Sequence, residues 1–195
     1  VVVDEFQLKS RVSGVPGIKR ESIFHALNQK AVARRYAKSI GKKYEELNLI
    51  VVHLGGGISV GAHRKGLVID VNNALNGEGP ISPERAGTVP SEALATLCFS
   101  GKYTLNEVKK MLHGKAGLAA YLGTSDMITI EEKAIEGKEP YKTLVAAMDY
   151  TVAKEIGAMF VALKGQCDAI ILTGGIAYSD YCVADIKEQI EYLCK

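Results

Sequence analysis

Three short apolar segments follow one another so closely that they restrict the fold more than any other feature. Residues 49–54, 58–63 and 67–71 are rich in aliphatic and β-branched side chains, and three residues separate each segment from the next. A crossover between parallel strands needs a dozen or more residues. The spacing therefore predicts an antiparallel meander with hairpin turns, the first of them through Gly55-Gly56-Gly57.

Helical periodicity accounts for much of the remaining chain. Apolar side chains recur at three- and four-residue spacing over residues 21–43, 91–99, 105–112, 140–163 and 179–193. Ser22 is a candidate cap for the first helix, and Leu27 belongs to its apolar stripe. Gly157 predicts a close approach of another backbone to the fourth helix, because glycine is otherwise unfavourable there. An apolar strand at 169–172, which we expect to be buried, completes the order of a ribonuclease-H-like α/β domain with a mixed sheet, without its last strand.

Two glycine-rich turns follow predicted strands. One is His53-Leu54-Gly55-Gly56-Gly57, and the other is Thr173-Gly174-Gly175 at the start of a helix. Glycine lets consecutive backbone N–H groups approach an anion such as phosphate, although a lone Gly-Gly-Gly also serves as a simple hairpin turn. Neither a P-loop nor a dinucleotide-binding G-x-G-x-x-G occurs in the chain. Together the two turns favour the other large class of ATP-binding folds.

Residues 72–90 lack a sustained period of either kind and are predicted to form a long loop. Loops of this length inside a compact domain are usually functional or disordered. Gly77, Gly79 and Gly87 surround Arg85 in this segment. This favours a functional loop, and a solvated surface arginine is the alternative.

Charge and apolar runs argue against several classes of protein. Lys and Arg number 24 against 22 Asp and Glu, so no nucleic-acid partner is expected. We interpret the basic residues near the N-terminus as a solvated helix face. They are Lys19, Arg20, Lys30, Arg34, Arg35, Lys38, Lys42 and Lys43. The apolar run 47–54 is far shorter than the ~20 residues of a membrane span, and Val1 opens no signal peptide, so no membrane partner is expected.

Cysteine and histidine show no metal-binding spacing. The residues concerned are Cys98, Cys167, Cys182, Cys194, His25, His53, His63 and His113. We interpret Cys98 and Cys167, which have apolar neighbours in the sequence, as small, reduced core residues. A cytoplasmic protein is the resulting expectation.

The chain begins with Val rather than Met, and Val1-Val2-Val3 is predicted to be a strand entered midway. We therefore expect a piece of a longer protein, with a fold that is incomplete at both ends. Residues 1–45 are predicted to hold the end of an N-terminal domain and a connecting helix. Residues 46–195 are predicted to form a nucleotide-binding ribonuclease-H-like domain that lacks its last elements.

Several motifs resemble one known group of proteins. Thr173-Gly174-Gly175-Ile176-Ala177 resembles the adenosine motif, and residues 53–57 resemble the second phosphate motif, of the acetate and sugar kinase/Hsp70/actin superfamily. Residues 2–6 (VVDEF), 22–30 (SIFHALNQK) and 77–87 (GEGPISPERAG) are similar to segments of the butyrate kinases of the acetokinase family. The motifs follow the family's order over essentially the whole chain.

This resemblance implies a reversible transfer of the ATP γ-phosphoryl group to butyrate, giving butyryl phosphate and ADP, with Mg²⁺ as cofactor. It implies that Arg85 and His25 lie beside the phosphoryl group in transfer and that Asp4 lies near the metal ion. It also implies a homo-oligomer. The implied nucleotide site comprises His53, Gly55, Gly56 and Gly57 at the phosphates, Asp126 near the ribose and adenine, and Gly174, Gly175 and Ile176 at the adenine.

A carboxylic acid as phosphoryl acceptor suits these residues. A short-chain acid has a pKa near that of a Glu side chain, ~4.3, and is already ionised at neutral pH, so no general base is required. Arg85 supplies the planar fork that a phosphoryl group in transfer needs. Taken singly, His25 could be a helix-face histidine and Asp126 a helix cap. A sugar kinase of the same superfamily and a non-catalytic nucleotide-binding module are the alternative functions.

The sequence departs from the family in three respects. Gly56 stands where the acetate kinase branch has Asn, which favours the butyrate branch. Ile128 stands where related chains often carry Arg, which leaves nucleotide affinity and base preference open. The family's first phosphate motif, expected upstream of Asp4, and its last strand and helices, expected after Lys195, are absent from these residues.

Overall fold

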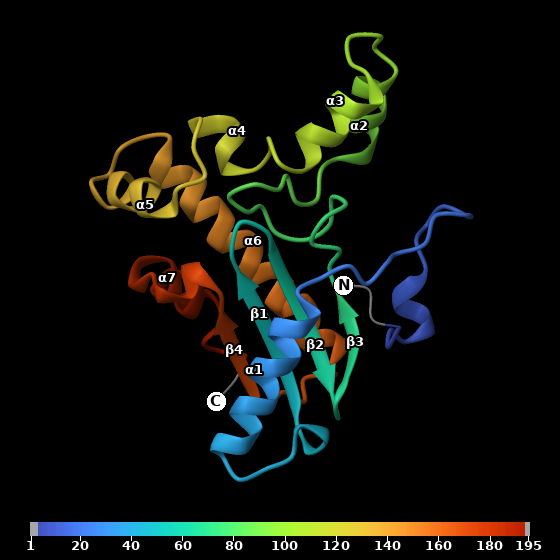
Figure 1. Ribbon diagram of the computed structural model, residues 1–195, viewed down its shortest axis with the longest axis vertical. Helices are drawn as coiled ribbons and strands as arrows, with labels where there is room; N and C mark the ends of the chain where they lie inside the picture. Colours follow the sequence, from blue (N-terminus) through green and yellow to red (C-terminus); the bar gives the residue numbers. More distant parts are fainter. Residues whose placement is uncertain (1–3, 194–195) are drawn as a thin grey trace.

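A four-stranded mixed sheet lies at the centre of the computed structural model, which describes residues 4–193 (Figure 1). β1 (Asn48–Leu54), β2 (Ile58–Arg64) and β3 (Leu67–Val71) form an antiparallel meander, and β4 (Ala169–Thr173) pairs in parallel with β1. The order across the sheet is β3-β2-β1-β4. The predicted meander and fold class are thereby confirmed. The strand predicted at residues 1–3 lies outside the described residues.

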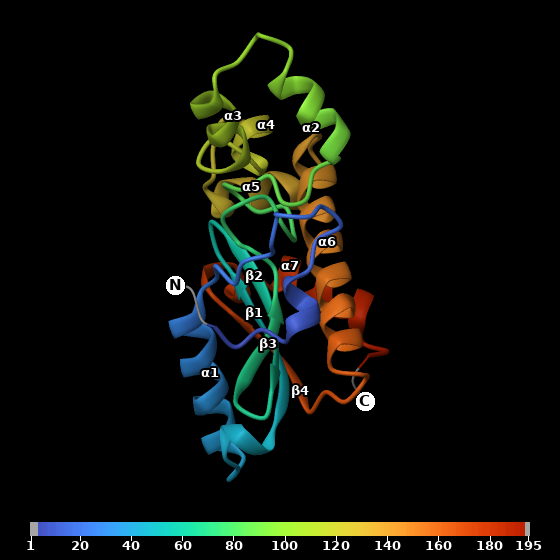
Figure 2. The ribbon, with the colours of Figure 1, turned by 90° about the vertical axis from the view of Figure 1, so that its right-hand side faces the viewer.

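Helices cover both faces of the sheet because side chains alternate along each strand. The even-numbered side chains of β1 enter the main core with α6 (Tyr141–Ala162) and α7 (Asp180–Ile190). The odd-numbered side chains near its start pack with α1 (Ala26–Ser39) on the opposite face. Figure 2 shows α1 and α6 on opposite sides of the sheet. The molecule is therefore built in three layers.

The shorter helices extend beyond one end of the sheet (Figure 1). They are α2 (Ser91–Cys98), α3 (Leu105–Leu112), α4 (Leu118–Leu122) and α5 (Met127–Ile135). Single 3-10 turns lie at Leu8–Arg11, Tyr44–Glu46 and Gly175–Tyr178. The predicted loop over residues 72–90 connects β3 to α2. Within residues 4–193, no helix has the length and apolar character needed to cross a membrane.

Helix α1 differs from its prediction in start and orientation. It begins at Ala26, after His25 in the N-cap position, so Ser22 is not its cap. Leu27 is 77% exposed, whereas Gln29 on the buried side is fully covered. The small side chains of Ala33 and Ala37 let the helix lie close to the sheet, and this packing, rather than the apolar count, decides which face is buried.

Three other interpretations are wrong. A Cβ atom added to Gly157 would meet nothing within 4 Å in the part of the chain that the structure describes, so none of that backbone approaches α6 there. Cys98 is exposed, because α2 lies in the extension and contributes no buried residue. β4, interpreted as a buried strand, is half-buried along its length, because it pairs only with β1 among the described residues. Cys194 lies outside the described residues.

We expect Gly174→Ala to lower the free energy of unfolding by about 2–4 kcal/mol, because the change combines a backbone penalty with overpacking. Gly174 has a φ of +96°, and an added Cβ would overlap the carbonyl oxygen of Leu54. Gly157→Ala is the matched control and should be neutral or stabilising by up to ~1 kcal/mol, since it improves helix propensity in open space. Urea unfolding measures both variants. Equal stabilities would contradict the close packing of Gly174 on β1.

Candidate active site

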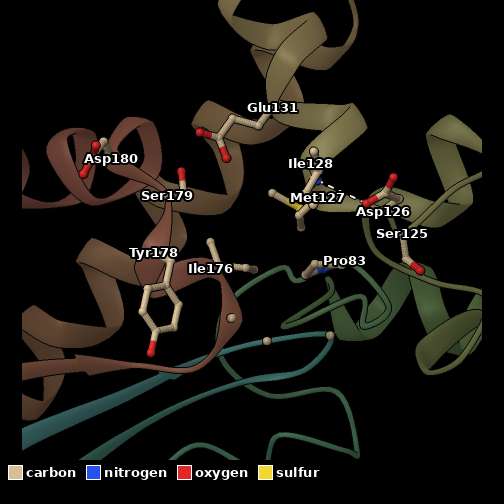
Figure 3. Close-up of a pocket in the computed structure, with 13 residues that line it drawn as sticks. Pro83, Ser125, Asp126, Met127, Ile128, Glu131, Ile176, Tyr178, Ser179 and Asp180 are labelled. Carbon is tan, nitrogen blue, oxygen red and sulfur yellow. Dashed lines mark hydrogen bonds between the residues drawn. The ribbon is translucent and has the colours of Figure 1, made fainter.

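A cavity of about 650 Å³ opens where the parallel strands β1 and β4 end (Figure 3). Four parts of the chain line it. They are Gly55 and Gly56 in the turn after β1, Pro83 in the loop over residues 72–90, residues within 125–131 at α5, and residues within 175–180 after β4. Ligands of open α/β sheets commonly bind beyond the carboxyl ends of the strands, so the cavity lies where a ligand is expected.

The cavity gathers part of the predicted nucleotide site. Its lining includes Gly55, Gly56, Asp126, Gly175 and Ile176. Gly174 lies instead against β1 and lines two hollows of about 450 and 460 Å³ on the side of α1. His53 and Gly57 adjoin a second group of side chains, which contains His25 and Arg85 and is described next.

The loop that carries Arg85 is fastened to the glycine turn after β1. The carbonyl oxygen of Gly56 accepts hydrogen bonds from Ser82 Oγ at 2.7 Å and from the backbone N–H of Glu84 at 3.0 Å. A Cβ atom on Gly57 would lie 3.7 Å from Cγ of Arg85. The arginine is therefore held beside the turn by backbone contacts, which a flexible surface loop would not provide.

The Arg85 side chain is only 26% exposed. Its Nη1 donates to the carbonyl oxygen of Glu84 at 3.0 Å and lies 3.6 Å from that residue's carboxylate. Its Nε is buried and has no hydrogen-bond partner within residues 4–193. A buried donor without a partner costs free energy, so the guanidinium is suited to receive an anion.

His25 and His53 stack on each other, with ring centroids 3.8 Å apart and an interplanar angle of 14°. Nδ1 of His25 lies 2.9 Å from Ser59 Oγ, and Nδ1 of His53 lies 2.9 Å from Asn28 Oδ1. Burial lowers the pKa of both rings, that of His25 to about 4 with further contributions from His53 and the charge of Arg85. Both histidines are therefore neutral near pH 7, and neither is a helix-face residue.

Asp126 both caps α5 and lines the cavity. Its carboxylate accepts from Thr129 Oγ1 at 2.7 Å and from the N–H of Ile128 at 3.2 Å, and these bonds lower its pKa. The capping interpretation is thus confirmed, and it is compatible with a place in the site. Ile128 is 73% exposed, and Figure 3 shows it and Ile176 on different walls of the cavity.

Asp4 is engaged outside the cavity. Its side chain is 83% exposed and forms an ion pair with Arg11. No group of three or more His, Cys, Asp or Glu that could hold a metal ion occurs among residues 4–193. Mg²⁺ usually binds through one or two carboxylates together with substrate phosphates. The described residues therefore form no metal cage of their own, and Asp4 would have to leave Arg11 to meet an ion.

Sequence reasoning missed several residues of the site. Glu131, Ser179 and Asp180 line the cavity from α5 and the start of α7, and Ser125 Oγ donates to the carboxylate of Glu84 at 3.2 Å. The sequence marks Ser179 only as the start of a helix. No local pattern shows that α5 and α7 face each other across a cavity, because their separation is set by packing on α6.

Comparison with solved structures identifies the class of fold. Acetate kinase from Porphyromonas gingivalis and a propionate kinase from Francisella tularensis each match with a TM-score of 0.85 at 23% identity. The matches cover 96% of this chain and 49% and 50% of those chains. A ROK family protein from Streptococcus pneumoniae matches with a TM-score of 0.51 at 14% identity, over 84% of this chain and 52% of its own. The fold is thus that of the acetate and propionate kinases, shared more distantly with the ROK protein.

Comparison of sequences identifies the family. Residues 5–194 match the acetokinase family, and the chain belongs to it. A "Probable butyrate kinase" from Phocaeicola vulgatus is 72% identical over 192 residues, and "Butyrate kinase 1" from Clostridium acetobutylicum is 56% identical over 193 residues. These matches cover 98% and 99% of this chain and 54% of each relative. The chain therefore spans about half the length of the curated relatives it matches, and the predicted family resemblance is confirmed.

We expect the His25 ring to stay neutral as the pH falls through ~6.5, the usual pKa of histidine, because its pKa is lowered to about 4. The unfolded chain takes up the proton first, so the stability contributed by the neutral ring is complete above pH ~6.5 and is lost as the pH falls through about 4. NMR titration of histidine-labelled protein, assigned with His25→Gln, measures the midpoint. A midpoint near 6.5 would show that the ring is solvated.

Proposed function

We propose that the whole protein is an ATP-dependent carboxylate kinase that converts butyrate, or a similar short-chain acid, reversibly to its acyl phosphate. The observation that carries this proposal is the attachment of the Arg85 loop to the glycine turn that lines the cavity. That arrangement puts an arginine whose buried Nε has no hydrogen-bond partner within residues 4–193 next to backbone amides suited to phosphate. Membership of the acetokinase family and the names of the two close relatives support the same activity.

The nucleotide occupies the cavity in this proposal. A volume of about 650 Å³ falls within the ~300–1,000 Å³ of small-molecule sites. The N–H groups of Gly55 and Gly56 face the phosphates, Asp126 accepts from the ribose hydroxyls, and Ile128 and Ile176 hold the purine between apolar surfaces. Ile128 replaces the charged contact of an arginine with apolar area, which is compatible with a flat aromatic base.

The chemistry of the transfer requires two anions to be held in line. The ionised acid attacks the γ-phosphorus through a carboxylate oxygen, and the bond to the bridging oxygen of ADP breaks. Arg85 donates to the equatorial oxygens, where charge accumulates in the transition state. The neutral His25 adds an N–H donor without a second positive charge. Asp4 would be the carboxylate that meets a Mg²⁺ ion bound with the nucleotide, and such an ion would neutralise phosphate charge.

Three further expectations belong to the same proposal. The protein is a homo-oligomer and works in the cytoplasm. The boundary between an N-terminal domain and the nucleotide-binding domain lies near residue 45.

The direct test is an acyl-phosphate assay on the purified whole protein. Butyrate, ATP and magnesium should give a product that hydroxylamine traps as the hydroxamate, and acetate serves as the comparison acid. Phosphorylation of sugars alone would contradict the proposal. Calorimetric binding of ADP without any turnover would instead favour a non-catalytic nucleotide-binding module.

Arg85→Ala should lower kcat by about 10²–10³, because a donor to transition-state charge is lost, while the Kd for the nucleotide changes little. Arg64→Ala is the matched control: Arg64 is an exposed arginine at the end of β2, and its removal should change neither quantity. Calorimetry and initial rates measure the two effects separately. Equal losses of binding and turnover in Arg85→Ala would show that the residue is structural.

A further inference from the structure

A chain of buried polar side chains runs from His25 into the middle of the protein. Nδ1 of His25 lies 2.9 Å from Ser59 Oγ, which lies 2.9 Å from Nε2 of Gln29. Oε1 of Gln29 lies 2.9 Å from Nε2 of His63, whose Nδ1 lies 2.6 Å from the Tyr44 hydroxyl. Gln29, Ser59 and His63 are 0% exposed, and Tyr44 is 3% exposed. Water therefore does not compete for these hydrogen bonds.

A single carbonyl group sets the direction of every bond in this chain. Nε2 of Gln29 also lies 3.1 Å from the backbone oxygen of Ser59, and a carbonyl oxygen can only accept. The amide nitrogen of Gln29 must therefore face Ser59, and its oxygen must face His63. His63 consequently donates from Nε2. Burial lowers the pKa of His63 to about 3, so its Nδ1 is unprotonated and accepts from Tyr44.

The same argument fixes the proton on Ser59. The two amide protons of Gln29 go to the carbonyl oxygen and to the hydroxyl oxygen of Ser59. The single hydroxyl proton of Ser59 then points to its other neighbour, Nδ1 of His25, because a buried hydroxyl proton without an acceptor is costly. A neutral imidazole whose Nδ1 accepts carries its proton on Nε2.

We infer that Ser59 and Gln29 are positioning residues that fix His25 in the Nε2–H tautomer, so that the Nε2 edge of its ring can only donate a hydrogen bond. Stacking on His53 at 3.8 Å restrains the plane of the same ring. The tautomer follows from the hydrogen bonds alone, whereas its catalytic use rests on the proposed function. A donor at this edge attracts a phosphoryl oxygen, and an acceptor would repel it.

Gly61 shows that strand β2 is adapted to this arrangement. A Cβ atom at this position would overlap Oε1 of Gln29 and would lie 3.2 Å from Nε2 of His63. Glycine inside a strand weakens it and often marks a site where another group approaches closely. The space left by Gly61 admits the amide of Gln29 to the sheet, where it reaches both Ser59 and His63.

The two ring nitrogens of His25 report the tautomer directly. In the whole protein with labelled histidine, the His25 spectrum, assigned with His25→Gln, should show an unprotonated Nδ1 and a protonated Nε2 near neutral pH. Ser59→Ala removes the donor to Nδ1 and should give a mixture of both tautomers. Gln29→Leu provides a second variant, which frees the Ser59 hydroxyl and should also give a mixture.

Tyr44→Phe is the matched control. It removes a buried hydrogen bond from the same chain, but the carbonyl group of Ser59 still sets the direction, so the His25 spectrum should keep the wild-type pattern. A variant with mixed tautomers should also be less active. Ser59→Ala should lower kcat about ten-fold, less than the ~10²–10³ for complete loss of a donor, and the KM for the nucleotide should not change.

A protonated Nδ1 in the wild-type protein would overturn the inference. An unchanged His25 spectrum in both Ser59→Ala and Gln29→Leu would also overturn it, because neither residue would then control the ring. Failure of the proposed function looks different: the spectra change as expected, but the wild-type protein forms no acyl phosphate. An altered spectrum with wild-type kcat would refute only the catalytic use of the tautomer.

Discussion

The parallel pairing of β4 with β1 is the contact on which the rest of the structure depends. The two strands are more than a hundred residues apart in the sequence, yet their carboxyl ends reach the same edge of the sheet. Gly174 makes this pairing possible at its end, because a side chain there would overlap the backbone of Leu54. The turn after β1 and the segment after β4 consequently lie next to each other in the lining of one cavity.

The remaining parts of the site are attached to this edge from both faces of the sheet. The loop of Arg85 is joined to the carbonyl group of Gly56, and α5 completes the cavity from the side of the main core. His25 and His53 come from the side of α1. The polar network on the α1 side reaches the cavity through His53, which stacks on His25 and lies beside Gly55 of the cavity lining.

Two kinds of buried polar group have different roles in this arrangement. The amide of Gln29 and the ring of His63 have partners on both sides, so they add order without leaving an unsatisfied group. Nε of Arg85 has no partner within residues 4–193. Such a buried donor gains a hydrogen bond when an anion binds. Gln29 and His63 therefore position other side chains, whereas Arg85 is suited to bind an anion.

Short-range patterns in the sequence determined much of the fold. Three-residue spacing predicted the meander, and helical periodicity over residues 140–163 predicted α6. Thr104 and Asp126 cap α3 and α5 through bonds to nearby backbone. The glycine turns and the family motifs correctly indicated a site at the edge of the sheet where β1 and β4 end. These features depend on residues a few positions apart, so the sequence by itself contains them.

Tertiary structure alone decided which side chains meet. Gln29 is buried while Leu27 is exposed, since close packing of small residues on the sheet, rather than hydrophobicity, orients α1. The roles predicted for Gly157 and Cys98 were wrong, because both residues have open surroundings. Glu131 lines the cavity because α5 packs on α6. Burial and contact between distant segments arise only when the layers pack, and no local pattern encodes them.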